Sequence, residues 1–514
     1  MFVDQAPASA AVLPILPPST QFDITGFLQA ATLDQACLTS AAANLDSNGF
    51  PQAAHCGGTM TLNGHTIIVP AETVAILPAS ALTWEELFAQ APAPYGPTQT
   101  GMALADVPKP LTTYEVHAVG NRVLDPANVD PTKRDRYIAG LVHIAQQDLN
   151  TGAGYINFMN YTTGEMEVGG VLGVAGTGAR VQVNDPLSGT SVSGGRYGRA
   201  MSPDPRFMVD QDNPTIASAT GFPMCFPRTD PAVTDDVLCP STNRPIDPTT
   251  GAFASTIMMT DPALIPLGGA LDPRVQAPME VGDYVFFEGT LTADAAGTYI
   301  SAHTIDENTA IFTFPGTNPA YVKIDVSLLG TGGTTAVGVG EATVRTRFEG
   351  MSTDTTRRIH LYGIDVNPDG TTSDRDWGTI FPDPSLAAGG AAPGRWRFRP
   401  GCLSFGSVPA KPTRDCVYGP GNQFLPATRE VRAVIEGLQT QDPANPAAVT
   451  SANGIYYGQY HAPIDEFLFP ENIPGAPIPE NNFNTMPFLA QGGYTSFSGV
   501  VAGVLNPWPS NIAP

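Results

Sequence analysis

The stretch GGTMTLNGHTIIVP, residues 57–70, predicts a β-hairpin and indicates the architecture of the chain around it. Met60 and Leu62 precede Asn63-Gly64, and Thr66, Ile67 and Val69 follow it, as expected for two short strands. Asn-Gly supplies the positive φ angles of the type I′ turn that joins two antiparallel strands. Similar short apolar runs recur between turn residues along the chain. We therefore expect a mainly β protein of several small β-barrel or sandwich domains, with few short helices.

Length and composition predict several packed units joined by irregular segments. The chain has 514 residues, and a single hydrophobic core stops growing near roughly 250 to 300 residues, so about two to four units are expected. Gly 53 and Pro 50 together approach a fifth of the chain, which is below the level of about 25 to 30% that indicates disorder. Long Pro/Gly-rich connections between the β domains are therefore expected.

The patterns divide the chain into six parts. LTWEELFAQ is the clearest helix, with Thr83 and Glu86 in capping-box spacing. Two blocks share a strand ending near a glycine, a polar turn and a return strand that contains Tyr155-Ile156 or Tyr299-Ile300, and they predict similar small barrels. The parts are an N-terminal extension (1–20), a β domain with a short helix (21–105), a second β domain (106–186), an irregular Pro-rich disulfide-containing connection (187–278), a third β domain (279–400) and an extended Pro-rich C-terminal region (401–514).

The six cysteines fall in three close pairs, and none has the Cys-x-x-Cys spacing of a zinc or redox motif. Closing loops of this length by disulfides stabilises a fold by about 3 kcal/mol each in the chain-entropy model. Disulfides persist in oxidising compartments, so this interpretation predicts an extracellular or cell-surface protein. Free thiols in a cytosolic acidic protein are the alternative. The predicted pairs are Cys37 with Cys56, Cys225 with Cys239, and Cys402 with Cys416.

The charge balance bears on the partners of the chain. The formal net charge is −23, and no concentrated basic face of the kind that binds nucleic acid is visible in the sequence. Cationic partners such as divalent metals fit this charge better. No stretch reaches about 18 uninterrupted apolar residues, so no membrane-spanning segment is expected.

The stretch DVNPDGTTSDRD, residues 365–376, is a candidate calcium loop. In such loops oxygen ligands at alternate positions converge on the ion, and a glycine at position six allows the sharp turn. The last position is Asp rather than the usual bidentate Glu, and the segment before it is strand-like. A hairpin turn at NPDG is the alternative. The candidate ligands are Asp365, Asn367, Asp369, Thr371, Ser373 and Asp376.

The stretch GRWRFRPG, residues 394–401, alternates arginines with aromatic residues. On a strand this pattern places Arg395, Arg397 and Arg399 on one face and the aromatic residues on the other. Such a strip with Trp396 can stack on sugar rings or bind an acidic partner. In so acidic a chain, the alternative is that the arginines pair with internal carboxylates while the aromatic rings enter the core.

No catalytic signature is strong. Asp204, Asp210 and Asp212 are close in sequence and can bind a metal or provide the paired carboxyl groups of a glycoside hydrolase, joined in that role by Asp465 and Glu466. Asx-turns closed by Arg206 are the alternative. The glycine run GGVLGVAGTGARV lacks the order of a phosphate-binding loop and predicts a flexible hairpin between strands.

The C-terminal stretch DEFLFPENIPGAPIPENNFNTMPFLAQGGY combines large apolar residues with prolines, so it must be extended. Its exposed aromatic residues predict docking on the chain itself or on a neighbouring copy.

Several stretches, among them SPDPRFMVDQDNPT, LCPSTNRP and FLFPENIPGAPIPENNF, resemble a group of secreted β-rich proteins of bacteria and filamentous fungi that has no assigned activity. The barrel blocks also look like the oligonucleotide/oligosaccharide-binding barrels of exported bacterial proteins. The resemblance implies export and β architecture and no catalytic residue.

We therefore expect a non-enzymatic, exported structural protein that self-assembles through its Pro-rich apolar segments into a filament, sheath or surface layer. One alternative is a secreted polysaccharide hydrolase, and another is a calcium-stabilised carbohydrate-binding module with extracellular glycan as its partner.

Overall fold

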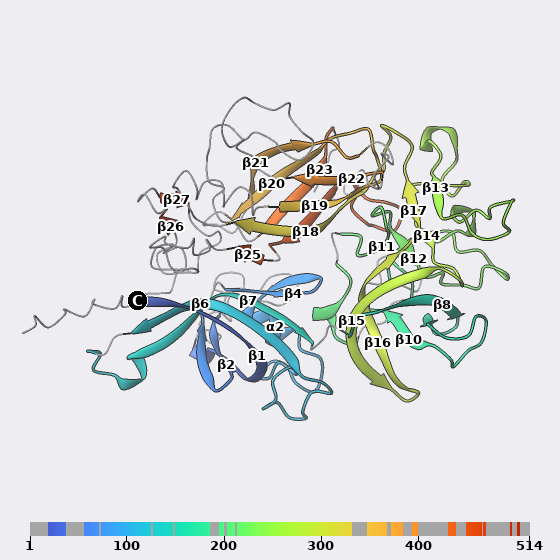
Figure 1. Cartoon of the computed structure of the whole chain (residues 1–514). Coiled ribbons are helices and arrows are strands. Elements are labelled where there is room, and N and C mark those ends of the chain that lie inside the picture. The colour runs from blue at the N-terminus through green and yellow to red at the C-terminus, as the bar shows by residue number, and fades with distance from the viewer. Residues whose placement is uncertain are drawn as a thin grey trace, which may run out of the picture.

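The computed structural model describes residues 19–36, 56–70, 73–124, 127–146, 150–185, 195–199, 203–210, 213–330, 347–366, 372–383, 393–398, 430–437, 449–464, 466–468, 494–495 and 501–503. The described chain is mainly β, as the sequence predicts, and its strands form three separate bodies (Figure 1). Among the described residues, none of the helices has the length and apolar character that crossing a bilayer requires.

The first body is a closed five-stranded barrel, which we call the first barrel. Its strand order is β3-β2-β1-β6-β7, and a parallel pairing of β7 with β3 closes it, while β4 and β5 extend the sheet from β7. Its strands are β1 (Ser19–Leu33), β2 (Gly58–Leu62), β3 (His65–Val69), β4 (Val74–Leu77), β5 (Ser80–Thr83), β6 (Tyr114–Leu124) and β7 (Asp135–Gln146), with the 3-10 helix η1 (Pro131–Lys133).

The predicted hairpin and helix are both confirmed in this barrel. Strands β2 and β3 are joined at Asn63 and Gly64, whose φ angles of 49° and 79° are those of the expected turn. Helix α2 (Trp84–Ala89) begins with the predicted capping box, in which Thr83 Oγ1 accepts from the Glu86 amide and Glu86 Oε2 accepts from the Thr83 amide at 2.7 Å. Local sequence alone therefore determines these two elements.

The second body, the second barrel, repeats the topology of the first. Its order is β10-β9-β8-β15-β16, closed by a parallel pairing of β10 with β16. In both barrels the strands follow the order one-two-three-five-four-one, with strands three and five parallel, which is the order of the oligonucleotide/oligosaccharide-binding barrel. The strands are β8 (Gly152–Asn160), β9 (Glu165–Val168), β10 (Ala179–Val183), β15 (Tyr284–Asp294) and β16 (Gly297–Glu307).

A long insertion, residues 184–283, separates the third and fourth strands of the second barrel, and we call it the connection. It is irregular, as predicted, but it packs closely, because Phe222, Met224 and Phe226 are buried in the core that it shares with the barrel. Its short elements, with the β17 strand that pairs with β13, are η3 (Pro205–Phe207), β11 (Ile216–Ser218), β12 (Met224–Cys225), η4 (Ser241–Asn243), β13 (Thr256–Met258), η5 (Pro262–Leu264), β14 (Ala277–Pro278) and β17 (Ala310–Phe312).

The connection contains one of the predicted disulfides. Cys225 and Cys239 are bonded, which confirms that pair. Cys56 is buried in the first barrel and is disulfide-bonded, while its predicted partner Cys37 lies outside the described residues. Cys402 and Cys416 also lie outside them.

The third body is a sandwich of two four-stranded sheets, β22-β19-β18-β25 and β21-β20-β23-β24. Its core packs Phe348, Trp377, Trp396 and Phe398 between the sheets. The strands, with a separate pair β26–β27, are β18 (Val322–Gly330), β19 (Arg347–Ser352), β20 (Ile359–Val366), β21 (Thr372–Ile380), β22 (Arg395–Phe398), β23 (Glu430–Ile435), β24 (Gln459–Pro463), β25 (Glu466–Leu468), β26 (Tyr494–Thr495) and β27 (Val501–Gly503).

The strand pairings divide the chain at different places from the predicted domain boundaries. Strands β6 and β7 pair with each other and with β1, so the first barrel continues past the predicted limit at residue 105 to residue 146. The predicted third domain, 279–400, contributes strands to both the second barrel and the sandwich, and strands from 401–514 complete the sandwich sheets. These pairings join residues that are distant in sequence, and local patterns carry no information about them.

A cluster of buried charges lies where the connection meets strand β16 of the second barrel. The Arg244 guanidinium donates to both carboxylate oxygens of Asp283, at 2.6 and 2.8 Å, and lies 3.9 Å from Glu307. Burial and, to a smaller extent, the charge of the nearby Asp283 raise the pKa of Glu307 to about 7. Burial also raises the pKa of Glu280 to about 7. Folding therefore opposes ionisation of both glutamates.

This cluster predicts a pH dependence of stability. A carboxyl group whose pKa is raised in the folded state binds more protons there than in the unfolded chain, so its contribution to stability falls as pH rises from about 4.5 to about 7. His143 and His303, whose pKa values burial lowers to about 4, act in the opposite direction. The histidine contributions are the same in a Glu307 variant and in the wild type. The difference between their free energies of unfolding therefore reports the effect of Glu307 alone. We expect Glu307→Gln to gain stability relative to the wild type across this window, on the order of 3 kcal/mol at most.

The measurement is urea unfolding between pH 4.5 and 7.5. The matched control is Glu115→Gln, which removes the same charge from an exposed position on β6 and should show a constant difference from the wild type. A flat difference profile for Glu307→Gln would contradict the role of Glu307.

Candidate functional site

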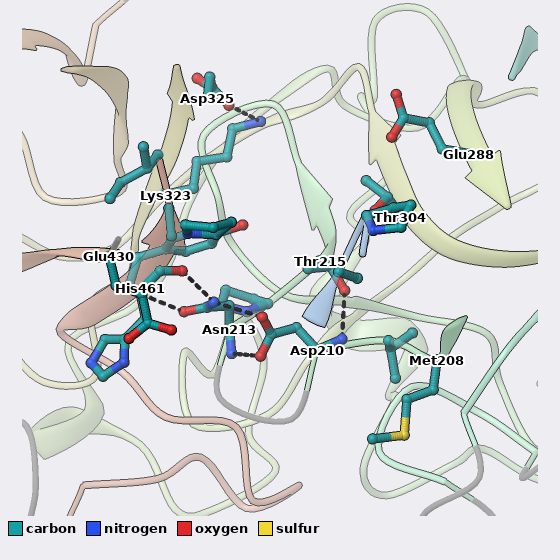
Figure 2. Close-up of a pocket in the computed structure, with 18 of the residues that line it drawn as sticks. Met208, Asp210, Asn213, Thr215, Glu288, Thr304, Lys323, Asp325, Glu430 and His461 are labelled. Atoms are coloured by element: carbon teal, nitrogen blue, oxygen red, sulfur yellow. Dashed lines mark hydrogen bonds and ion pairs between the residues drawn. The ribbon is translucent and has the colours of Figure 1, made fainter. Parts of the chain in front are cut away.

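A pocket of about 750 Å³ lies where the three bodies and the connection meet, and we call it the junction pocket. Its walls come from every body: residues 78–90 of the first barrel, 205–215 of the connection, β15 and β16 of the second barrel, and β18, β23 and β24 of the sandwich. Its size is typical of a small-molecule site. Figure 2 shows the polar side chains that point into it.

The outer face of β15 and β16 forms one wall. Because side chains alternate along a strand, Val285, Phe287 and Ile305 enter the barrel core. Their neighbours therefore point outward into the pocket. These outward residues are Phe286, Glu288, Thr304 and Asp306.

A buried lysine faces this wall from the sandwich. Lys323 and Asp325 are two residues apart on β18 and share a face. Lys323 Nζ lies 2.9 Å from an oxygen of Asp325 (Figure 2). It also lies 2.9 Å from an oxygen of Asp306, so it joins the sandwich to the second barrel. Burial by itself lowers the pKa of Lys323, but the two carboxylates outweigh it and hold that pKa above its usual value. The lysine stays charged.

The carboxyl groups beside the lysine differ in their environments. Burial raises the pKa of Glu288, and the charge of Asp306 raises it further. Asp306 accepts a hydrogen bond from the Lys323 ammonium at 2.9 Å. Burial also raises the pKa of Asp325 against the opposing effect of Lys323. On this wall, therefore, the carboxyl group of Glu288, whose pKa is raised, lies near that of Asp306, which is ion-paired with Lys323.

The connection forms another wall of the junction pocket, across from β15 and β16. Asn213 donates from its amide nitrogen to Asp210 Oδ2 at 2.8 Å and to the His461 carbonyl at 2.6 Å, and its side-chain oxygen accepts from the His461 amide at 2.8 Å (Figure 2). These bonds fix Asp210 and join the connection to β24 of the sandwich. The shape of the pocket therefore depends on how the connection and the sandwich pack against each other.

The chemistry of the lining selects a class of ligand. Six carboxyl groups face one lysine, and exposed parts of Phe286 and Tyr460 provide ring surface. Such a lining disfavours anions, while it offers hydrogen-bond acceptors to hydroxyl or ammonium groups. The acidic residues are Glu86, Asp210, Glu288, Asp306, Asp325 and Glu430.

The acids that the sequence suggested for hydrolysis are placed differently. Asp204 is buried and binds Arg206 through both oxygens, at 2.9 and 2.7 Å, as the Asx-turn alternative expects. Asp210 lines the junction pocket. Asp212 and Asp465 lie outside the described residues, and the side chain of Glu466 is not described. The structure does not bring Asp204 and Asp210 together as a catalytic pair.

The candidate calcium loop lies at the turn between β20 and β21. Asp365 pairs with Ser373, and Asp376 pairs with Tyr362, so the first and twelfth positions are separated along the ladder by about 10 Å. The Asp376 carboxylate accepts from His360 Nε2 at 2.6 Å. Within the described residues, no group of three or more His, Cys, Asp or Glu side chains is arranged to hold a metal. Asn367, Asp369 and Thr371 lie outside that part of the chain, so calcium binding stays a prediction.

The arginine strip forms β22 and lies against an internal carboxylate. Arg395 and Arg397 both pair with Glu349, at 2.7 and 2.8 Å. Trp396 is 1% exposed and packs in the sandwich core, so it presents no ring face to a ligand. This is the core-packing alternative, and it replaces the interpretation of Trp396 as a binding residue. Arg399 lies outside the described residues.

Sequence analysis missed Glu288, Asp306, Lys323 and Asp325. Each is a charged residue at an outward position of an otherwise apolar strand, as in YVFFEGT and YVKIDV. That alternation was a detectable signal for an outward charge. Their convergence was not detectable, because it depends on how two bodies pack.

Comparisons with protein-family models, with curated proteins and with solved structures found no match for the chain.

Proposed function

We propose that the protein is exported and binds a short carbohydrate, neutral or carrying an amino group, in the junction pocket. The observation that carries this proposal is the lining of that pocket, in which carboxyl groups, an amide and a lysine surround a partly exposed aromatic ring. Sugar hydroxyls both donate and accept hydrogen bonds, so they match this mixture. An anionic sugar would meet the repulsion of the carboxylates.

Two further features support the proposal. The barrels have the strand order of a fold that binds oligosaccharides in other proteins, which supports the proposal by analogy of fold. The Cys225–Cys239 disulfide favours an oxidising compartment, where extracellular glycans are met.

The environments of Glu288 and Asp306 also suit hydrolysis of a bound glycan. A glycosidase pairs a carboxylic acid that protonates the leaving group with a carboxylate that acts as base or nucleophile. Glu288, with its raised pKa, fits the first role, and Asp306, held by Lys323, fits the second. The polysaccharide hydrolase is therefore the enzymatic form of the same proposal.

Titration calorimetry with a panel of oligosaccharides tests the binding. We expect neutral or amino sugars to bind, and polyuronates or sulfated glycans to give no heat. Glu288→Gln and Phe286→Ala should each weaken binding by about tenfold or more, because each removes a direct contact. The control is Glu436→Gln, an acidic residue of the sandwich that does not line the pocket.

Product analysis of the same mixtures separates binding from cleavage. Cleavage that Glu288→Gln abolishes identifies a hydrolase, whereas binding without products identifies a binding module. A panel that shows neither binding nor products contradicts the proposal.

Self-assembly is a second candidate function, and the loop between β9 and β10, residues 169–178, favours it. This loop exposes Val171 (61%), Leu172 (66%) and Val174 (46%). Glu167 accepts the Gly176 amide at 2.7 Å and two further amides of the loop. Carboxylate and backbone bonds thus hold the predicted flexible hairpin in one conformation, and the apolar side chains are presented at little entropic cost.

We infer that this apolar tip contacts a second copy of the chain. The net charge of −23 opposes association at low ionic strength, so assembly should increase with salt. Mass photometry between 20 and 500 mM NaCl, with Leu172→Asp as the variant, checks this inference. We expect oligomers that grow with salt in the wild type and are lost in Leu172→Asp, with Leu172→Val as the matched control. Particles that stay monomeric at every salt concentration would exclude it.

A further inference from the structure

Two histidines lie side by side on the outer surface of the first barrel. His117 on β6 is directly opposite His143 on β7, and their ring centroids are 6.0 Å apart with 29° between the ring planes. Their neighbours along the strands, Val116 and Val142 among them, enter the barrel core, so both imidazoles point outward. The two histidines are 26 residues apart in the chain, so the sequence alone does not show that they are neighbours.

The carboxylate of Asp23 contacts one histidine of the pair. Asp23 on β1 lies 2.7 Å from His117 Nε2, which leaves Nδ1 of the same ring for another partner. Among the described residues, no hydrogen bond reaches the ring of His143.

We propose that His117 and His143 bind a first-row divalent transition metal, with Asp23 orienting His117. Neutral imidazole is the ligand that Zn²⁺, Ni²⁺ and Cu²⁺ prefer in proteins. A metal-bound histidine usually donates its other N–H to a carboxylate, and this is the contact that Asp23 makes. Two protein ligands leave the remaining coordination positions to water, so the site is open. His117 is 43% exposed and Asp23 60% exposed, so an ion has access from solvent.

The chain offers an internal comparison. His360 also bonds an aspartate, Asp376, through Nε2 at 2.6 Å. Its Nδ1, however, is 2.9 Å from the Tyr362 hydroxyl, and its ring stacks on Tyr362 rather than on a second histidine. A histidine–aspartate pair without a free nitrogen and a second imidazole should not bind the metal, so His360 is a matched control.

Calorimetric titration of the full chain with ZnCl₂, repeated with CuCl₂, tests the site. We expect one equivalent to bind, Cu²⁺ more tightly than Zn²⁺. His117→Gln and His143→Gln should lose this binding, and Asp23→Asn should weaken it by about 10- to 100-fold. His360→Gln should bind as the wild type does. Excess Ca²⁺ should not compete, which separates this site from the candidate loop at 365–376.

Every result of this titration either supports the metal site or contradicts it. If His143→Gln fails to fold in a thermal melt, His117→Gln, at a half-exposed position, decides alone. Zinc binding that survives His117→Gln, or no binding by the wild type to either metal, overturns the assignment. The site lies on the first barrel and does not line the junction pocket, so this result is independent of the carbohydrate proposal.

Discussion

The arrangement of the three bodies depends on the buried guanidinium of Arg206. This side chain is 1% exposed and lies between the connection and the first barrel. It binds Asp204 through two nitrogens and donates to the carbonyls of Leu87 and Thr100, both at 2.6 Å. The adjacent Phe207 enters the core of the first barrel. Because a buried charge is strongly unfavourable without its partners, these contacts permit only one docking of the connection on that barrel.

The junction pocket follows from this constraint and from two similar ones. Lys323 joins the sandwich to the second barrel, and Asn213 joins the connection to the sandwich. Each contact places a polar group at the boundary between bodies, where it both fixes their positions and lines the cavity. The polar groups that hold the bodies together are therefore the same groups that a ligand meets. This explains why the junction pocket is lined by polar groups from every body.

The sequence predicted what depends on neighbouring residues and missed what depends on packing. The hairpin at Asn63-Gly64, the capping box of α2 and the Cys225–Cys239 disulfide are local, and each was predicted correctly. Tyr155 and Tyr299 were assigned to equivalent return strands of similar barrels, but they lie in the first and fifth strands of the same barrel. The second barrel closes through the pairing of β10 with β16, which are more than a hundred residues apart in the chain. Asp210 was predicted because it belongs to a cluster of acidic residues that is local in the sequence. Glu288, Asp306 and Lys323 were not predicted, because only the packing of two bodies brings them together.

Hydrogen–deuterium exchange of Arg206→Lys against the wild type tests the central claim most directly. A lysine keeps the charge, but its single nitrogen cannot reproduce the planar fork with which Arg206 bonds both oxygens of Asp204 and donates to two carbonyls from another nitrogen. The account predicts faster exchange in α2 and in the described parts of 205–215, at the walls of the junction pocket, with β15 and β16 protected as in the wild type. Unchanged exchange at those walls, or an equal increase throughout the chain, would contradict it.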